Sequence, residues 1–216
     1  ELAMSSLFSM SRFTYDAYRK MPDQGNDGFK ALKKSYSKGT ELRGKTLGII
    51  GFGGIGKALA EYALGCGMNV VFTTSSEKES ENIKLVIAGQ TARITVKGVS
   101  MDELLETSDF ISLHVPKQSD GSSVIDKGAF QKMKDGVCLV NTSRGGSIDE
   151  DALLEALNNG KVKAAALDVF VGEPSPREDI LKHDRILATP HIGGSTVEAQ
   201  DRIGVELADQ IIDLYK

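Results

Sequence analysis

A glycine-rich stretch that directly follows a short apolar run limits most strongly what this chain can fold into. Residues 51–56 read Gly-Phe-Gly-Gly-Ile-Gly and come straight after the β-rich run Lys45–Ile50. Apolar residues then recur with helical spacing over Ile55–Leu64, and a second β-rich run occupies Met68–Thr73. A strand, a glycine loop, a helix and a second strand in this order predict a βαβ unit of the kind that binds dinucleotides.

The residues of this loop have expected roles at a pyrophosphate. Gly51 permits the tight turn, Gly53 lets the main chain approach the anion, and Gly56 allows the helix to pack closely. The backbone amides of Gly54 and Ile55 point at the anion from the start of the helix. The alternative is a tight turn that binds nothing, but the complete strand, loop, helix and strand context favours a dinucleotide.

The end of the second β-rich run bears on which dinucleotide is bound. An acidic residue about 20 positions beyond the glycines usually holds the adenosine ribose. Here the first carboxylate is Glu77, 21 positions after Gly56 and beyond the expected strand end. A ribose hydroxyl can instead bond to Thr74, which favours NAD. The missing strand-end carboxylate, together with Lys78, leaves NADP as the alternative.

Strands and helices continue to alternate along the rest of the chain. Near-continuous runs of Val, Ile, Leu and Ala, each followed by a helix, predict parallel strands that are covered on both faces. The expected fold class is therefore α/β, a Rossmann-type doubly wound parallel sheet, and residues 1–216 form one dinucleotide-binding domain. The further strand candidates are Phe110–Val115, Val137–Asn141, Ala164–Val169 and Ile186–Ala188.

Capping patterns predict where three of the helices begin. Ser100 with Glu103 forms a capping box, Asp149 caps the helix that follows it, and Ser195 with Glu198 begins a last helix that runs to the end of the chain. These starts place each helix directly after a loop or a strand candidate.

Two segments lie outside the regular alternation. Residues 1–21 have the apolar spacing of an amphipathic helix that ends near Pro22, and residues 22–38 are expected to form a connection with a short helix. The segment Glu77–Val99 is compatible either with a helix or with extra strands.

Composition excludes several classes of partner. The chain has 26 basic and 30 acidic side chains, a net charge of −4 and a pI near 5.5, so neither nucleic acid nor an anionic membrane surface is expected as a partner. No apolar run is long enough to span a bilayer, and the start at Glu1 does not resemble a signal peptide, so we expect the cytoplasm. Cys66 and Cys138 have no metal-site spacing, and we expect two reduced thiols and no metal.

Three polar and glycine-rich segments follow strand candidates, at the edge where open α/β sheets bind ligands. They are Asn141–Gly146, Leu167–Pro174 and Thr189–Thr196. With the glycine loop and the segment Leu113–Pro116, they resemble the D-isomer-specific 2-hydroxyacid dehydrogenases over nearly the whole chain. Residues 191–196, followed by residues 198–200, are most similar to the D-3-phosphoglycerate dehydrogenase branch, which serves serine biosynthesis.

This resemblance implies three catalytic residues, each with a chemical reason. Arg144 grips the substrate carboxylate and polarises its carbonyl, because a planar guanidinium can hold two oxygens at once. His191 takes or supplies the hydroxyl proton, and an unperturbed imidazole titrates near neutral pH. Glu173 bonds to the other ring nitrogen and orients the imidazole.

The resemblance also implies a set of residues around the cofactor. Asp168 accepts a hydrogen bond from the nicotinamide carboxamide or its ribose, although a helix cap or a salt bridge competes as an interpretation. We expect His114 to be structural and His183 to be a solvated loop residue. The further cofactor-lining residues are Val115, Pro116, Thr142, Ser143, Arg144, His191, Gly193 and Gly194.

The implied partners are a small hydroxy or keto acid and a second copy of the chain. Family members form dimers through the helix expected at residues 1–21, so we expect a homodimer. Their substrate domain, which begins upstream of this cofactor domain, is missing from the chain, so we expect very low turnover from these residues alone. The alternatives are an NADP-dependent glyoxylate or hydroxypyruvate reductase, and an NAD-sensing binding protein of the C-terminal-binding-protein type.

Overall fold

A single sheet organises the computed structural model, which describes residues 1–76 and 78–215. In the described residues the sheet has eight strands in the order β3-β4-β2-β1-β5-β6-β7-β8, and all neighbours are parallel except β3 and β4. The strands predicted from the sequence are found within two residues of their expected bounds. The strands are β1 (Thr46–Ile50), β2 (Asn69–Thr73), β3 (Ser80–Ile87), β4 (Gln90–Gly98), β5 (Phe110–Leu113), β6 (Val137–Asn141), β7 (Val162–Leu167) and β8 (Ile186–Ala188).

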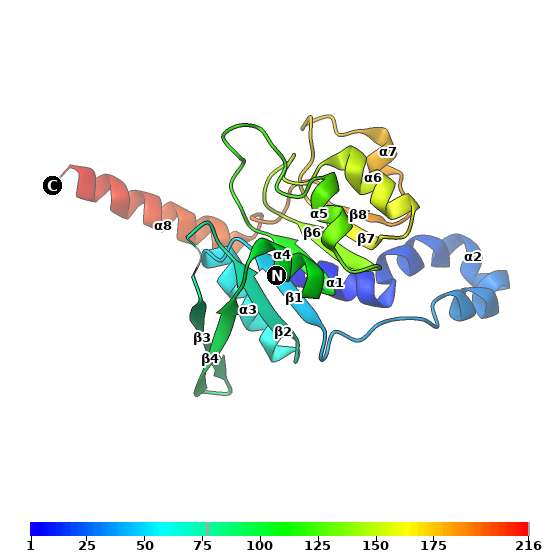
Figure 1. The fold of residues 1–216 in the computed structure, drawn as a ribbon, viewed down its shortest axis with the longest axis horizontal. Helices are drawn as coiled ribbons and strands as arrows, with labels where there is room; N and C mark the ends of the chain where they lie inside the picture. The colour runs from blue at the N-terminus through cyan, green and yellow to red at the C-terminus, as the bar shows by residue number, and fades with distance from the viewer. Residues whose placement is uncertain (77, 216) are drawn as a thin grey trace.

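Helices cover both faces of this sheet (Figure 1), which confirms the predicted doubly wound α/β class. On one face, Leu7 of α1 and Leu59 of α3 are buried in one apolar cluster with side chains of the strands. On the other face, Leu104 of α4 and Leu153 of α6 are buried in a second cluster. These helices are α1 (Leu2–Arg12), α3 (Gly54–Gly65), α4 (Met101–Thr107), α5 (Lys127–Lys132), α6 (Glu150–Asn158) and α7 (Glu178–Leu181).

The N-terminal region corrects the prediction of one helix over residues 1–21. The backbone of Phe13 takes a left-handed conformation with φ 56°, and this residue ends α1 and begins α2 (Thr14–Ser35). Pro22 lies inside α2 instead of ending a helix. Pro22 has no amide hydrogen to donate to the carbonyl of Tyr18, and Tyr18 is 83% exposed, so this part of α2 lies at the surface.

The segment that the sequence left undecided forms an antiparallel hairpin of β3 and β4. Its two-residue turn, Ala88 and Gly89, has positive φ at both positions, as a type I′ turn requires. The apolar side chains of Ile83, Leu85 and Val96 point into the cluster that contains α3. The hairpin therefore extends the sheet beyond β2 and forms its edge beside that helix.

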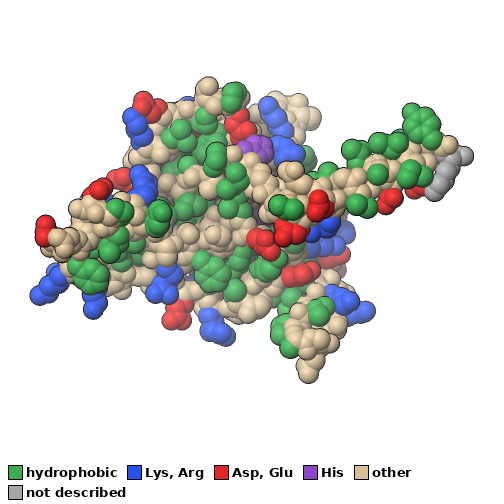
Figure 2. Space-filling view, turned by 180° about the vertical axis from the view of Figure 1, so that it is seen from behind, with side chains coloured by type: hydrophobic (Ala, Val, Ile, Leu, Met, Phe, Trp, Pro, Cys, Tyr) green, Lys and Arg blue, Asp and Glu red, His purple; other side chains and the backbone are tan. Residues whose placement is uncertain are grey.

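The last helix, α8 (Val197–Leu214), extends away from the body of the molecule (Figure 1). None of its described residues is buried, and Figure 2 shows apolar side chains along it. Its cap is Thr196, whose Oγ1 accepts the Ala199 amide, and not the predicted Ser195. The amide of Ser195 is still bonded to Ile192 in the preceding turn. No helix in the described part of the chain combines the length and apolar character that a bilayer span needs.

The other two predicted helix starts are confirmed. The Oγ of Ser100 accepts the Glu103 amide at 3.1 Å, and Asp149 Oδ1 accepts the Asp151 and Ala152 amides at 3.0 Å each. The Ser100 cap fixes the start of α4 after β4, and the Asp149 cap fixes the start of α6 after the loop that follows β6.

Candidate active site

Three loops that follow parallel strands begin side by side at the carboxyl edge of the sheet. The last residues of β6, β7 and β8, which are Asn141, Leu167 and Ala188, lie in register across the three strands. The loops after these residues carry the side chains that the sequence singled out as catalytic. The topology thus brings segments far apart in the chain to one place.

An imidazole and a carboxylate face each other across two of these loops. His191 Nδ1 lies 2.8 Å from Glu173 Oε2. The other oxygen of Glu173, Oε1, accepts the Phe170 amide at 2.8 Å. The hydrogen bond from His191 and then that of Phe170 hold the pKa of Glu173 below its usual range. Because Nδ1 is used in this contact, Nε2 is the ring nitrogen that remains for a substrate proton.

Asp168 organises the loop that carries His191. Its carboxylate is buried, with 1% of the residue exposed. Oδ1 accepts the Thr189 hydroxyl at 2.6 Å and the Ile192 amide at 2.8 Å, and Oδ2 accepts the Gly193 amide at 2.7 Å. This is neither the helix cap nor the salt bridge that the sequence left open. The expected contact between Asp168 and a nicotinamide stays a prediction.

The loop after β6 is held by an asparagine at the strand end. Asn141 Oδ1 accepts the amide and the hydroxyl of Ser143, and Asn141 Nδ2 donates to the carbonyl of Arg144 at 3.0 Å. The side chain of Arg144 is exposed to solvent. A Cβ on Gly145 would lie 1.9 Å from the Phe170 carbonyl oxygen, so this loop packs directly on the loop of Glu173.

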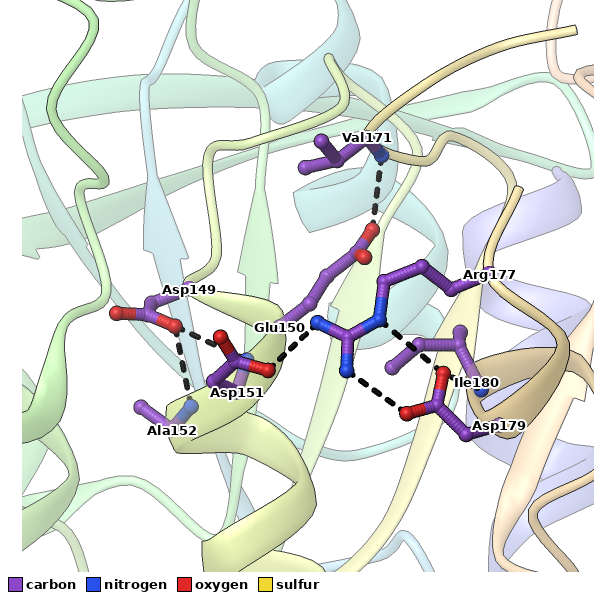
Figure 3. Close-up of polar contacts among 8 residues, drawn as sticks. All are labelled: Asp149, Glu150, Asp151, Ala152, Val171, Arg177, Asp179 and Ile180. Carbon is purple, nitrogen blue, oxygen red and sulfur yellow. Dashed lines mark hydrogen bonds and ion pairs between the residues drawn. The ribbon is translucent and has the colours of Figure 1, made fainter. Parts of the chain in front are cut away.

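A second carboxylate, that of Glu150, binds the backbone of the loop that follows β7 (Figure 3). Glu150 Oε1, at the start of α6, accepts the Val171 amide at 2.8 Å, while Oε2 is buried and has no hydrogen-bond partner among the described residues. Burial raises the pKa of Glu150. Arg177 adds a link between α6 and the segment after the turn, because it pairs with Asp151 at 2.6 Å and with Asp179 at 2.7 Å.

Sequence reasoning placed Asn141 in a segment at the ligand-binding edge without giving it a role, and it missed Glu150. The only local signal for Asn141 is an amide at the end of an otherwise apolar strand. The signal for Glu150 is an acidic run that also serves as an ordinary helix start. Neither pattern shows which distant backbone groups the side chain binds.

The glycine loop has the geometry of a pyrophosphate cradle. Gly51 has φ 92°, and a Cβ there would lie 2.3 Å from the His114 carbonyl oxygen. A Cβ on Gly56 would lie 2.3 Å from the Gly51 carbonyl oxygen. By contrast, Gly53 and Gly54 have open space on the side where a Cβ would stand. The first amides of α3 lack acceptors within the helix and meet this open side, so the residues fit a dinucleotide pyrophosphate.

Among the residues expected along the cofactor, Val115 lies at this cradle, whereas Thr142 and Gly193 lie beside each other at the catalytic loops. A Cβ on Gly51 would be 2.9 Å from Val115 Cγ1, and a Cβ on Gly193 would be 3.9 Å from Thr142 Cβ. Pro116 is exposed beside them. The strand ends therefore bring these positions to the same edge as the catalytic loops, and their contacts with a cofactor stay predictions.

Two of the remaining cofactor positions are open to solvent, whereas Ser143 is buried and its hydroxyl donates to Asn141. Ile55 is 68% exposed at the start of α3, and Gly194 has open space on its Cβ side. Thr74 Oγ1 lies 3.2 Å from Ser76 Oγ just past β2. Glu77, the carboxylate considered for the ribose, lies outside the described residues.

The other two histidines have structural surroundings. His114 Nε2 lies 2.9 Å from Ser112 Oγ, its Nδ1 is buried without a described partner, and burial lowers its pKa to about 4. This supports the predicted structural role. His183 is a loop residue whose Nδ1 accepts the Arg185 amide at 3.1 Å.

The sheet order and the glycine loop define a dinucleotide-binding domain of the doubly wound class, with a histidine and glutamate pair at its carboxyl edge. The family model described as "D-isomer specific 2-hydroxyacid dehydrogenase, NAD binding domain" matches residues 4–193. The chain belongs to this family, and the matched domain is the one that binds NAD. The resemblance inferred from the sequence is thereby confirmed.

Two relatives of this chain are named after different substrates. A hydroxypyruvate reductase of Thermotoga maritima is 44% identical over 214 residues, which are 98% of this chain and 64% of that protein. A D-3-phosphoglycerate dehydrogenase of Archaeoglobus fulgidus is 44% identical over 207 residues, which are 93% of this chain and 37% of that protein. The chain thus spans less than two thirds of the length of either relative.

Solved structures agree with the fold. A glyoxylate reductase from Paecilomyes thermophila matches with a TM-score of 0.76 and 34% identity, over 94% of this chain and 57% of that chain. The NAD-dependent formate dehydrogenase of Staphylococcus aureus, solved with NAD, matches with a TM-score of 0.80 and 28% identity, over 99% of this chain and 60% of that chain.

Proposed function

We propose that this chain is the cofactor-binding part of a dehydrogenase that transfers a hydride between NAD(H) and a D-2-hydroxy acid. The observation that carries the proposal is the 2.8 Å contact between His191 and Glu173 at the carboxyl edge of a dinucleotide-binding sheet. Such a pair holds a proton-transfer group in one orientation. Membership of the 2-hydroxyacid dehydrogenase family supports the same reaction.

Each catalytic side chain has one task in this proposal. When bound, NAD+ would accept the hydride in oxidation and NADH would donate it in reduction. The Nε2 of His191 accepts the hydroxyl proton in oxidation and returns it in reduction, while Glu173 orients the ring and stabilises the imidazolium. Arg144 binds the substrate carboxylate through its two-pronged guanidinium. Because Gly145 packs against the backbone of Phe170, the loop that carries Arg144 is in direct contact with the loop that carries Glu173.

We further infer 3-phosphoglycerate as the substrate, which would place the chain in serine biosynthesis. The support is the segment from His191 to Gln200 and the relatives named D-3-phosphoglycerate dehydrogenase. The hydroxypyruvate reductase of similar identity favours hydroxypyruvate as the second candidate. Comparing kcat/KM of the full-length protein for the two pairs of substrates decides between them, and a higher value for hydroxypyruvate would reject 3-phosphoglycerate.

The reaction itself is tested by His191→Ala in the full-length protein. Loss of general acid and base catalysis should lower kcat by about 100- to 10,000-fold. NADH should still bind, because the glycine loop that holds the pyrophosphate is untouched. His183→Ala provides the matched control, since it removes a histidine from a loop remote from the pair. A variant lacking His191 that keeps its turnover would reject this assignment.

We also infer that the chain pairs with a second copy through its N-terminal helices, and we expect the pair in the cytoplasm. α1 is packed on the sheet, so the exposed apolar side chains of α2 support this contact: Tyr18 is 83% exposed and Phe29 is 58% exposed. Light scattering during size-exclusion chromatography should give a dimer that Tyr18→Glu with Phe29→Glu dissociates. Tyr215→Glu, directly after the end of α8, is the control, and a monomeric parent protein would reject the inference.

A further inference from the structure

The adenosine end of the cofactor site contains an ion cluster that the doubly wound fold does not require. In such folds the ribose lies between the glycine loop and the end of the second strand, where a carboxylate usually accepts its hydroxyl. Here β2 is followed by the hydroxyl residues Thr74, Ser75 and Ser76. A carboxylate nevertheless reaches this region from another strand, because Glu81 belongs to the hairpin strand β3.

The carboxylate of Glu81 forms ion pairs with two lysines, Lys57 and Lys78. Its Oε1 lies 2.7 Å from Lys57 Nζ, and its Oε2 lies 3.3 Å from Lys78 Nζ. The side chain of Glu81 is 23% exposed, whereas those of Lys57 and Lys78 are 38% and 53% exposed. The bond from Lys57 and then that from Lys78 keep the pKa of Glu81 below its usual range, so the carboxylate is charged at neutral pH.

Backbone contacts place this cluster beside the expected ribose. Lys57 is in the first turn of α3, and its amide donates to the carbonyl of Gly53 in the cradle. The end of β2 is joined to the hairpin, because Phe72 pairs with Gly98, whose amide donates to the Glu79 carbonyl at 2.8 Å. The cluster therefore bridges the two structures that flank an adenosine ribose.

We propose that Glu81 is the residue that makes this domain select NADH over NADPH. The 2′-phosphate of NADPH would need positive groups at this place, and two ammonium groups are present. Glu81 pairs with both of them, which lowers their combined charge from +2 to +1 and weakens the attraction for a phosphate. The antiparallel hairpin thus supplies the charge that is absent from the end of β2. This inference rests on the proposed function only in requiring that the cradle binds the cofactor.

The test compares the dissociation constants of NADH and NADPH by fluorescence titration. The parent protein should bind NADH more tightly. Glu81→Gln keeps the shape but removes the charge, and it should lower the NADPH dissociation constant at least about fivefold while that of NADH changes little. The gain should shrink in high salt, because these charges are partly exposed to solvent. Glu103→Gln is the matched control, since it removes the partner of another exposed lysine, Lys97.

A second set of variants tests the mechanism. Adding Lys57→Met and Lys78→Met to Glu81→Gln should abolish the gain in NADPH affinity. If Glu81→Gln leaves the preference unchanged, or if Glu77→Gln alone produces the gain, Glu81 is not the selecting residue. A parent protein that prefers NADPH would also reject the inference. Failure to bind either nucleotide would instead reject the proposed cofactor function, and this inference with it.

Discussion

The carboxylate of Asp168 lies 2.7 Å from the backbone amide of Gly193, although 25 positions separate the two residues in the sequence. The same side chain accepts the Ile192 amide and the Thr189 hydroxyl, so three of its contacts surround the residue that carries the imidazole. His191 itself has a left-handed backbone with φ 56°. A buried carboxylate that binds neighbouring amides can hold a non-glycine residue in that conformation.

The first prediction therefore concerns Asp168→Asn. An amide group has one acceptor oxygen, and its NH2 group would face a backbone amide or a hydroxyl at a buried position. Leaving such a donor unsatisfied costs about 1–3 kcal/mol, which for a chain of this size lowers Tm by roughly 2–12 °C. We also expect lower turnover in the full-length protein.

Calorimetry and steady-state kinetics measure both effects. Asp135→Asn is the control, because that side chain is 90% exposed in a surface ion pair. Equal Tm values for the parent and the Asp168→Asn protein would show that the buried carboxylate does not hold the loop.

The second prediction concerns Glu173→Gln. Glutamine can still accept the Phe170 amide, so the turn should remain folded. It cannot stabilise an imidazolium as a carboxylate does, and we expect kcat of the full-length protein to fall by about 100-fold or more with unchanged NADH affinity. Glu178→Gln, at an exposed position on α7, is the comparison. A fall in NADH affinity with kcat preserved would contradict the role assigned to Glu173.

Much of this site could be predicted from the sequence because parallel strands end at one edge. Arg144, Glu173 and His191 each follow an apolar run, and the glycine loop fixes which edge binds the cofactor. The contact of His191 with Glu173 was therefore foreseeable from topology together with family resemblance. Local patterns carry this information because strands and glycine turns are set by residues close together in the chain.

The remainder depends on contacts that no local pattern specifies. Asp168 and Glu150 bind backbone amides of loops that are 21 to 25 positions away. The end of α1 at Phe13 depends on how α1 packs against the sheet. The continuation of α2 through Pro22 depends on the solvent exposure of that helix. In the hairpin of β3 and β4, buried and exposed side chains alternate over only a few residues. The sequence pattern was therefore also compatible with a helix.

The third prediction separates folding from cofactor binding at the glycine loop. Gly53 has φ −80°, which alanine adopts readily, and a Cβ there would meet no atom within 4 Å. Gly53→Ala should therefore leave Tm unchanged, yet its methyl group would stand where the pyrophosphate approaches. We expect a loss of NADH affinity of about tenfold or more, equivalent to about 1.4 kcal/mol.

The control for this change lies on the same helix. Gly65, at the far end of α3, also has open space at its Cβ position, so Gly65→Ala should affect neither folding nor NADH binding. Titration calorimetry and thermal unfolding of the two variants give the comparison. Unchanged NADH affinity in Gly53→Ala would place the pyrophosphate elsewhere.

The fourth prediction concerns the pH dependence of stability and His114. Burial lowers the pKa of His114 to about 4, whereas an unfolded histidine titrates near 6.5. The stabilisation that this difference provides is fully present above the pKa of His114 in the unfolded chain. It is lost as pH falls toward the pKa of His114 in the folded protein, because only the unfolded chain then binds a proton. The free energy of unfolding should drop by about 2 kcal/mol between pH 7 and pH 5 from this ring alone.

Urea unfolding of the parent and of His114→Gln at both pH values isolates that contribution. Other groups titrate in the same range, and Glu150 acts in the opposite direction because its pKa is raised. Their effects cancel in the difference between the two proteins, since glutamine does not titrate. His183→Gln carries the same replacement at a loop position for comparison. If the free energies of unfolding of the parent and of His114→Gln change in parallel with pH, the ring takes up its proton in the folded state. The contact with the Ser112 hydroxyl at 2.9 Å would then be made by an imidazolium.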